Sequence, residues 1–572
     1  MSTSTPSKPQ SAVIIGAGVA GLATAALLAK DGIKVTVVER NDATGGRAGN
    51  LVLDEAPGYR WDTGPSWYLM PEAFDHFFEL MGTSTAEQYE LADLSPAYRL
   101  YPEGGAPIDL ETGKEEVSEL FESLEPGAGA RIERYLDSAS DAYFTALDHF
   151  LYTTFKDPRK LVHDDIRSRA GRLGSLLSKN LKDYVGNQFD DHRIQQVLTY
   201  PAVFLSTQPA KAPALYSLMS HTDLVEGVRY PRGGFAAVVA AIDALAREAG
   251  VEIITGADAT AILTEATGAT GISAALAKAA GLANSALSKV GVTPASAAKP
   301  ARATGVRVHT PEGVRDIHAD VVVSAADLHH TETALLPPEL RTYPESYWAK
   351  RDPGLGTVLI FMGVEGELPE LAHHTLMFSK EWDADFKAVY EGPEPSRPLG
   401  SSRSIYISRT SATDDDAAPE GHENLFVLIP VPPAEGVGQG DAYAQYTTGR
   451  VEAIADAAIE QIGQWAGIDN LAERVVVRRT LGPADFANRY NAWSGGSIGP
   501  AHTLAQSAFL RGANTSAKVD GLYYAGATTV PGVGVPMCLI SAENILKRIH
   551  GDTSTGPLES LDALPGNLNG GA

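Results

Sequence analysis

The sequence is poor in cysteine, since Cys538 is its one cysteine in 572 residues. An intrachain disulfide is therefore excluded, and no Cys-x-x-Cys pair or Cys/His cluster is available for zinc or an iron–sulfur cluster. The sequence predicts no bound metal. It also favours a reducing compartment, and we expect the cytoplasm.

Basic residues are also scarce, because 46 Lys and Arg face 71 Asp and Glu, a formal charge of −25. Nucleic acid binds through Lys and Arg at its phosphates, so we expect no nucleic-acid partner. The chain is longer than the roughly 250 to 300 residues at which one core stops growing, which predicts two or more domains. With 44% hydrophobic residues, the composition is that of a globular protein.

Residues 11–29 form a long apolar stretch that has no charged residue. It could be taken for a signal sequence or a membrane span. However, it contains three glycines and is followed by the alternating pattern of residues 33–39. We therefore interpret it as strand, glycine-rich turn and helix, followed by a second strand, and we predict no transmembrane helix.

Strand-like runs such as 319–325 and 521–525 alternate with helical stretches such as 235–248, which indicates an α/β protein. Residues 1–9 and 551–572 have the composition of flexible, unpacked ends. An insertion rich in Ala, Ser, Gly and Thr, about 265–303, separates two strand-like runs where a short hairpin turn would be the default. Ala-rich helices and a flexible loop are both compatible with its composition.

Residues 156–183 form a basic segment with eight Lys and Arg against four Asp, a local charge of +4. If the segment is helical, Leu and Ile residues would share its surface with the positive charges. An amphipathic, membrane-contacting segment is one interpretation. A solvated helix face is the other.

The first chemical motif is a Gly-x-Gly-x-x-Gly turn formed by Gly16, Gly18 and Gly21, with Ala20 inside it. It follows a predicted strand and opens a predicted helix, as dinucleotide binding requires, because the helix N-terminus and the glycine backbone accommodate a pyrophosphate. Glu39 ends the second strand, where a carboxylate can accept hydrogen bonds from a ribose, which favours FAD or NAD over NADP. A purely structural glycine turn is the alternative.

Three further motifs favour FAD. Gly45-Gly46-Arg47 resembles the GGR element of the flavin amine oxidase and carotenoid desaturase superfamily, and residues 62–65 resemble its D-x-G-P element. Residues 521–537 resemble the C-terminal FAD motif of bacterial carotenoid desaturases of the phytoene desaturase type. Many members have His where this chain has Val530, and Gly or Ser where it has Thr528, so an essential histidine at residue 530 is excluded.

The resemblance extends over nearly the whole chain, including residues 230–234, 373–375, 413–421 and 485–507. It implies a Rossmann-like FAD-binding domain of the GR2 or amine-oxidase type and a discontinuous α+β substrate domain. We assign the first to residues 10–84, 222–329 and 481–550, and the second, which would also contact the membrane, to 85–221 and 330–480.

The implied cofactor-binding residues come from all three parts of the FAD domain: Gly16, Gly18, Ala20, Gly21, Glu39, Arg40, Gly45, Gly46, Arg47, Gly64, Pro65, Ser66, Ala259, Gly526, Ala527, Gly534, Val535, Pro536 and Met537. Arg232 is expected in a turn near the flavin. Asp164 and Arg167, three positions apart in the basic segment, match an Asp and an Arg suggested as acid/base residues in the family; an exposed ion pair is the alternative. His373 and His374 are expected to be partly exposed surface residues.

The resemblance implies an FAD-dependent phytoene desaturase that introduces double bonds into a long polyisoprenoid hydrocarbon by hydride transfer to flavin and proton loss. Its electrons would pass to oxygen or a quinone. A diapocarotenoid desaturase, a carotene isomerase and an amine oxidase are alternatives within the superfamily. A non-enzymatic prenyl-lipid carrier of the GDP-dissociation-inhibitor type is another. We expect a cytoplasmic protein that associates peripherally with the membrane.

Overall fold

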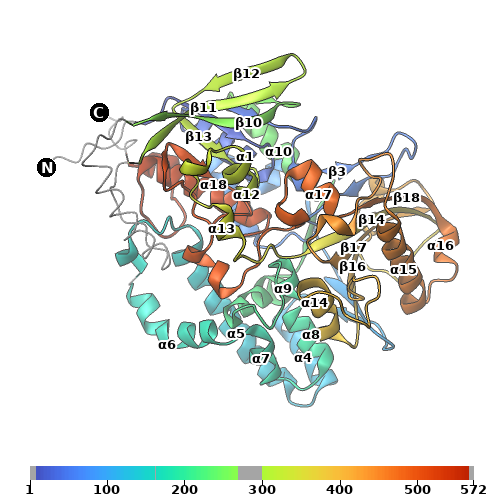
Figure 1. The fold of residues 1–572 in the computed structure, drawn as a ribbon. Helices are drawn as coiled ribbons and strands as arrows, with labels where there is room; N and C mark the ends of the chain where they lie inside the picture. The colour runs from blue at the N-terminus through green and yellow to red at the C-terminus, as the bar shows by residue number, and fades with distance from the viewer. Residues whose placement is uncertain (1–7, 162, 268–298, 566–572) are drawn as a thin grey trace.

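A computed structural model describes residues 8–161, 163–267 and 299–565 (Figure 1). Its first layer is a parallel sheet in the order β20-β13-β1-β2-β9. The strands are short and apolar, as expected for parallel strands buried on both faces. They come from distant parts of the chain: β1 (Ser11–Ile15), β2 (Lys34–Val38), β9 (Glu252–Ile254), β13 (Val321–Ser324) and β20 (Leu522–Tyr524).

Helix α1 (Val19–Lys30) follows β1 and packs between α10 (Phe235–Glu248) and α18 (Val535–His550). Ten consecutive residues of α1, from Val19 to Leu28, are buried, because other elements surround it. The prediction of strand, turn, helix and second strand is confirmed. No helix among the residues that the structure describes has both the length and the apolar composition required to cross a bilayer.

An antiparallel sheet of β10 (Asp258–Ala266), β11 (Ala301–Thr310) and β12 (Gly313–His318) lies against this domain, and β19 (Val519–Asp520) joins it beside β11. Strands β10 and β11 pair from Asp258↔His309 to Ala266↔Ala301. The two strands that flank the insertion are therefore adjacent, as predicted. Residues 268–298 lie outside the described part of the chain.

The largest sheet has seven strands in the order β18-β14-β17-β16-β15-β6-β7. Odd and even residues of its central strands face opposite layers: Val358 and Ile360 pack against α15 (Gly449–Ala466), whereas Leu359 and Phe361 pack in a second core. The strands are β6 (Tyr98–Pro102), β7 (Ile108–Leu110), β14 (Gly356–Glu365), β15 (His374–Phe378), β16 (Ile405–Ser408), β17 (His422–Val431) and β18 (Val475–Leu481).

Helices from residues 114–199 form the lower part of the molecule in Figure 1. They are α4 (Lys114–Leu124), α5 (Ala128–Ala146), α6 (Asp164–Ser178), α7 (Leu181–Gly186) and α8 (His192–Thr199). Helix α5 continues into a π-helical turn, η2 (Leu147–Leu151). Shorter elements include β3 (Asn50–Leu51), β4 (Trp61–Asp62), β5 (Leu91–Asp93), β8 (Arg229–Pro231), α2 (Pro71–Met81), α3 (Thr85–Gln88), α9 (Pro201–Phe204), α12 (Leu328–Ala334), α13 (Glu345–Trp348), α14 (Trp382–Tyr390), α16 (Leu471–Arg474) and α17 (Pro483–Tyr490).

The C-terminal segment corrects one prediction. Leu558 and Leu564 are buried in the core around α1 and α18, and the Leu558 N–H donates to Glu543 at 2.9 Å. The expectation of an unpacked end is therefore wrong for residues 551–565. At the other end, Lys8 forms an ion pair with Asp31 at 2.9 Å. Residues 1–7 and 566–572 lie outside the described ranges.

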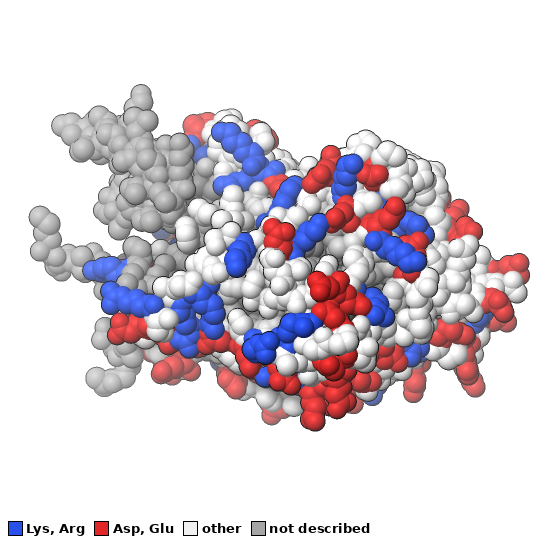
Figure 2. All heavy atoms as spheres, turned by 90° about the horizontal axis from the view of Figure 1, so that it is seen from below, with Lys and Arg blue, Asp and Glu red and all other residues white. Residues whose placement is uncertain are grey.

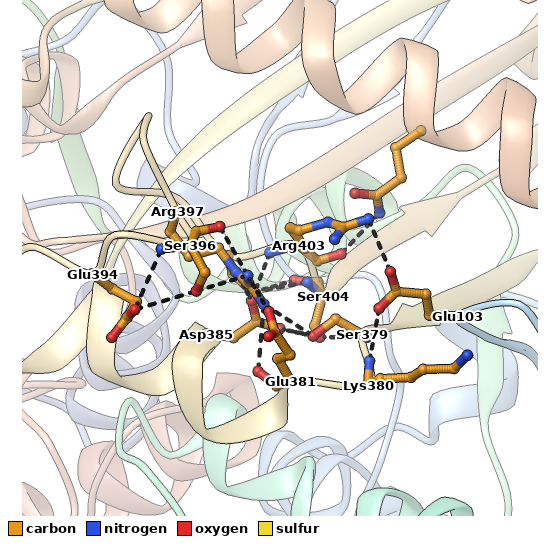
Figure 3. A network of polar contacts seen from close by, with 12 residues as sticks. Glu103, Ser379, Lys380, Glu381, Asp385, Glu394, Ser396, Arg397, Arg403 and Ser404 are labelled. Atoms are coloured by element: carbon orange, nitrogen blue, oxygen red, sulfur yellow. Dashed lines mark hydrogen bonds and ion pairs between the residues drawn. The ribbon is translucent and has the colours of Figure 1, made fainter.

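A buried polar network fixes the loops between β15 and β16 (Figure 3). Asp385 accepts hydrogen bonds from Arg397 Nε at 2.7 Å, from Ser379 Oγ at 2.7 Å and from the Arg403 N–H at 2.9 Å. The side chains of Asp385 and Arg397 are 4% and 1% exposed. A buried pair with this many hydrogen bonds holds a fold in place, and none of these residues lines the cavity described next.

Candidate active site

A cavity of about 690 Å³ extends from the parallel sheet into the space between the large sheet and the lower helices. At one end it is lined by Gly16, Gly18 and Glu39, and at the other by apolar residues of α6 and of the loop near Phe509. All the predicted cofactor residues line it except Gly21. The structure therefore brings three distant parts of the chain to one site.

The two ends of the glycine turn, Gly16 and Gly21, are in close backbone contact. A Cβ atom on Gly21 would lie 1.9 Å from the Gly16 carbonyl oxygen, so a larger residue would force the turn open. Gly21 therefore packs against the turn without lining the cavity, whereas Gly18 is the N-cap residue of α1 and lines the cavity. The turn leaves the first N–H groups of α1 directed at the space where an anionic pyrophosphate fits.

Glu39 lies at the end of β2 and is 5% exposed. Its Oε2 accepts from the Ala17 N–H at 2.7 Å, and its Oε1 accepts from the Asn41 N–H at 2.9 Å. Beside it, Arg40 donates to Asn491 Oδ1 at 2.7 Å. Oε1 also accepts from the Asn41 side-chain amide at 2.9 Å, so the acceptor capacity that a ribose hydroxyl requires remains on Oε2.

The GGR element lies along the middle of the cavity. Gly45 and Gly46 have φ angles of +107° and +58°, and a Cβ on Gly46 would lie 3.3 Å from Gly18 Cα. Arg47 Nη1 donates to the carbonyls of Ser497 and Ile498 at 3.1 Å each. These contacts hold the guanidinium at the cavity wall, where it can neutralise phosphate.

Asp62 supports the adjacent wall. Its Oδ1 accepts from the Phe235 N–H at 3.1 Å, and burial raises the pKa of its carboxyl to about 7. A Cβ on Gly64 would lie 2.2 Å from the Arg47 carbonyl oxygen, so the D-x-G-P turn requires glycine at that position. Pro65 and Ser66 continue from it as cavity residues.

The C-terminal motif is shaped by Arg511, a residue that no sequence motif indicates. Arg511 is buried and donates to the carbonyls of Ala527 at 2.6 Å, Thr529 at 3.0 Å and Pro500 at 3.1 Å. Burial lowers the pKa of its guanidinium to about 10. Arg511 therefore organises the loop that leads through Gly534 into α18, and it was missed because its partners are backbone carbonyls rather than a recognisable motif.

These residues fit FAD. The glycine turn admits a pyrophosphate, Glu39 admits a ribose, and the cavity continues past Arg47 to Gly526–Met537, where a second ring system can lie. Its volume lies within the range of about 300 to 1,000 Å³ typical of ligand sites. The wall contains the side chain of Cys538, whose thiol pKa is raised by burial to about 11, so the thiol is protonated at neutral pH.

Beyond this region the cavity becomes apolar. Its walls there are Phe155, Leu173, Leu177, Phe204, Leu215, Leu218, Met219, Leu504, Phe509 and Leu510. Leu177, Leu504 and Phe509 are 40%, 50% and 45% exposed, so this branch ends at the surface. A long hydrocarbon could enter here without crossing a charged wall.

His502 is an imidazole in the wall of this apolar branch, and sequence reasoning missed it. Its Nδ1 lies 3.1 Å from the Leu205 carbonyl oxygen, which assigns the ring proton to Nδ1. Burial lowers the pKa of His502 well below its usual value, with a further contribution from Arg511. The ring is therefore neutral. Its Nε2 lies close to Gly532: a Cβ atom on that glycine would be 2.4 Å from this nitrogen.

The structure does not bring Asp164 and Arg167 to the cavity. Their side chains are 94% and 66% exposed, Arg167 Nη1 lies 3.4 Å from Asp164 Oδ1, and neither residue lines the cavity. They lie on the outer face of α6, because Leu173 and Leu177 of that helix are the residues turned toward the cavity. Asp164 and Arg167 therefore form an exposed ion pair, which was the alternative interpretation of these two residues.

Two other expectations are corrected. His373 and His374 are 5% and 0% exposed, because β15 is an interior strand between β16 and β6. His374 stacks on Trp67, a cavity residue, with ring centroids 5.3 Å apart. Arg232 is not a cavity residue; it forms an ion pair with Glu90 at 2.9 Å at the surface.

The family is established by comparison with known proteins. Residues 19–279 and 291–548 match the model of the flavin containing amine oxidoreductases. The chain therefore belongs to the flavin containing amine oxidoreductase family, and FAD is its cofactor.

Within this family the chain belongs with the carotenoid desaturases. It is 37% identical over 540 residues to the carotenoid 3,4-desaturase of Haloarcula japonica, a match that covers 94% of this chain and 98% of the relative. It is 29% identical to the zeta-carotene-forming phytoene desaturase of Myxococcus xanthus, covering 94% and 93% of the two chains.

Solved structures show the same fold at low identity. Wild-type putrescine oxidase bound to putrescine has a TM-score of 0.54 at 15% identity, covering 95% of this chain and 99% of that one. An oxidoreductase from Methanosarcina mazei also has a TM-score of 0.54 at 15% identity, covering 94% and 100%. These likenesses confirm the predicted α/β FAD-binding fold.

Proposed function

We propose that this protein desaturates a long acyclic carotenoid of the phytoene type. The observation that carries the proposal is the continuity of one cavity, in which a dinucleotide cradle opens into an apolar branch that reaches the surface. FAD, when bound, supplies the hydride acceptor. The chain binds and orients both molecules, and the apolar walls exclude water from the reacting carbons.

A second candidate is desaturation at the end of an already conjugated carotenoid. It is favoured by the 37% identity to a carotenoid 3,4-desaturase, which exceeds the 29% identity to the phytoene desaturase of Myxococcus xanthus. Amine oxidation is less favoured, because the apolar branch lacks, among its described lining residues, a carboxylate to pair with a substrate ammonium.

Product analysis distinguishes these activities. The purified protein is offered phytoene, a fully conjugated acyclic carotenoid, or putrescine in separate incubations, and the products are separated by chromatography. New double bonds in phytoene support the first proposal, whereas reaction only at the ends of the conjugated carotenoid supports the second. Oxidation of putrescine alone would contradict both.

A variant with a larger side chain in the apolar branch tests whether the substrate binds there. Leu218 lines the branch, so Leu218→Trp is expected to reduce turnover at least tenfold while the flavin spectrum is retained. Ala472→Trp, on the exposed surface of α16, is the control and should behave like the parent protein. Equal turnover in both variants would show that the substrate does not occupy this branch.

We further propose that reduced flavin passes its electrons to oxygen or a quinone. One Gly-x-Gly-x-x-Gly turn of the strand-turn-helix kind is present, and FAD uses it. Turnover is therefore expected without NAD⁺ or NADP⁺ and with consumption of oxygen or an added quinone. Product formation that requires NAD⁺ in equal amounts would contradict this proposal.

Peripheral membrane association is the remaining proposal. The branch opens beside exposed Leu177, Leu504 and Phe509, and Figure 2 shows basic side chains toward the end of the molecule where α6 lies. Within the basic segment, Arg169 and Arg172 are engaged by Asp141, so other residues must supply the charge for contact with anionic lipid. Each Lys or Arg near such a surface contributes about 1 kcal/mol.

Charge reversal tests this association. Among the exposed lysines of the segment are Lys156, Lys160 and Lys179. Changing these three to Glu is expected to abolish salt-sensitive sedimentation with anionic liposomes while the FAD spectrum is retained. The control carries the same change of charge elsewhere on the exposed surface, at Lys34, Arg315 and Lys350. If both variants lose sedimentation equally, net charge rather than this surface governs binding.

A further inference from the structure

Three potential metal ligands meet where α5 ends and α6 begins. His149 lies in the π-helical turn η2, His163 is the N-cap residue of α6, and Asp165 lies in the first turn of that helix. One donor atom from each lies within 4.8 Å of the other two. π-Helical turns occur preferentially at functional sites, because they displace side chains from the regular helical positions.

The spacing of the donors suits a small tetrahedral ion. His149 Nε2 lies 3.3 Å from Asp165 Oδ2. Two ligands bound to zinc at about 2.0 to 2.2 Å with a tetrahedral angle are separated by roughly 3.3 to 3.5 Å. The His163 ring stacks on the His149 ring with centroids 5.3 Å apart. The Asp165 N–H donates to His163 Nδ1 at 3.3 Å, so binding through Nδ1 would replace this contact, whereas binding through Nε2 would leave it in place.

Neighbouring groups orient the carboxylate. Arg169 donates to Asp165 Oδ1, which leaves Oδ2 on the side of His149, and Arg169 is itself held by Asp141 at 3.0 Å. An Asp carboxylate is ionised at neutral pH, as a metal ligand must be.

We propose that His149, His163 and Asp165 bind one divalent transition-metal ion of the zinc class, with water in the fourth position. Two imidazoles and one carboxylate suit zinc and its neighbours in the first transition row, whereas Mg²⁺ and Ca²⁺ prefer oxygen ligands alone. The exposure of His163 and Asp165 gives the ion access from solvent. This proposal does not depend on the reaction that the protein catalyses.

A metal ion at this site would connect two segments that line the cavity, the end of α5 with η2 and helix α6. Phe150 and Leu151, which follow His149, line the cavity, and so do Leu173 and Leu177 of α6. A bound ion would therefore restrain α6 against the end of α5 beside the surface opening. The sequence did not predict this site, because His149 and His163 are fourteen positions apart and only the fold brings them together.

Direct metal binding tests the proposal. Full-length FAD-loaded protein is treated with a chelator, dialysed and titrated with Zn²⁺, and bound metal is measured by equilibrium dialysis and elemental analysis. The parent is expected to bind one Zn²⁺ per chain, with affinity at least tenfold weaker in His163→Ala and in Asp165→Asn. Hydrogen exchange in the first turn of α6 should slow when Zn²⁺ is added to the parent, but not to Asp165→Asn.

Matched controls separate this site from adventitious binding. Asp164→Asn removes the adjacent exposed carboxylate, and His309→Ala removes an exposed imidazole on β11. Both should bind Zn²⁺ as the parent does, and all variants should retain the flavin spectrum. The proposal is overturned if the parent binds no stoichiometric Zn²⁺, or if Asp165→Asn binds it as tightly as Asp164→Asn.

Discussion

The Glu39 carboxylate accepts a hydrogen bond of 2.7 Å from the N–H of Ala17, which lies inside the glycine turn. The end of β2 and the turn after β1 are thereby tied to each other. The same carboxylate lines the cavity, so it shapes the dinucleotide site and also offers acceptors to it. A motif residue usually assigned to ligand binding is here also part of the architecture of the turn.

Glu39→Ala is therefore expected to weaken FAD binding by about 1.5 to 3 kcal/mol, because buried, charge-assisted hydrogen bonds are lost. The dissociation constant is measured by titrating flavin-free protein with FAD and following flavin fluorescence. Glu252→Ala, at an exposed position on the neighbouring strand β9, is the control and should leave affinity unchanged. Unchanged affinity in Glu39→Ala would contradict the assigned role.

FAD is expected to be held without a covalent bond. Cys538 lies in the cavity wall, but burial raises its thiol pKa to about 11, so the nucleophilic thiolate is rare at neutral pH. Acid precipitation should release all the flavin into the supernatant, and Cys538→Ser should retain the same flavin content as the parent. Flavin that remains with the precipitated protein would show a covalent attachment.

The local features of the FAD site could be predicted because each depends on a few adjacent residues. The contact between Gly16 and Gly21 is determined within six positions of the chain, so the sequence pattern indicates it directly. The α/β fold was predictable for a similar reason, since strands and helices carry their own periodicity. Nearly all the predicted cofactor residues line the cavity.

Features that depend on distant segments could not be predicted in the same way. His374 is buried because β15 lies between two strands that come from residues 98–102 and 405–408. Leu564 is buried because residues 551–565 fold back onto α1 and α18. Both are determined by tertiary packing, which overrides the polar or loop-like composition of the local sequence.

The buried pair of Arg397 and Asp385 is expected to contribute strongly to stability but not to catalysis. Arg397→Ala leaves the Asp385 carboxylate buried without its cation, which should cost about 3 to 5 kcal/mol in the free energy of unfolding. Arg167→Ala removes an exposed partner of Asp164 and should cost less than about 1 kcal/mol. Chemical denaturation measures both, and equal losses would contradict the structural assignment of the buried network.

The contact between His550 and Asp31 predicts a pH dependence of stability. His550 Nε2 lies 2.8 Å from Asp31 Oδ2, and His550 Nδ1 lies 3.0 Å from the Pro565 carbonyl oxygen. Burial alone would lower the pKa of His550, but these hydrogen bonds outweigh it and raise the pKa above the ordinary value of 6.5. Folding therefore favours the protonated ring, and the C-terminal segment is attached through it.

The stabilisation from protonated His550 should be complete below about pH 6.5 and lost as the pH rises through the higher pKa of the folded state. The difference in melting temperature between the parent and His550→Gln is thus expected to shrink from pH 6 to pH 9. This comparison removes the contribution of Asp62, which has a pKa of about 7 and titrates equally in both proteins. His309→Gln, at an exposed site, should show no such trend. A difference between parent and His550→Gln that stays constant with pH would mean that the ring is neutral when it holds residues 551–565 in place.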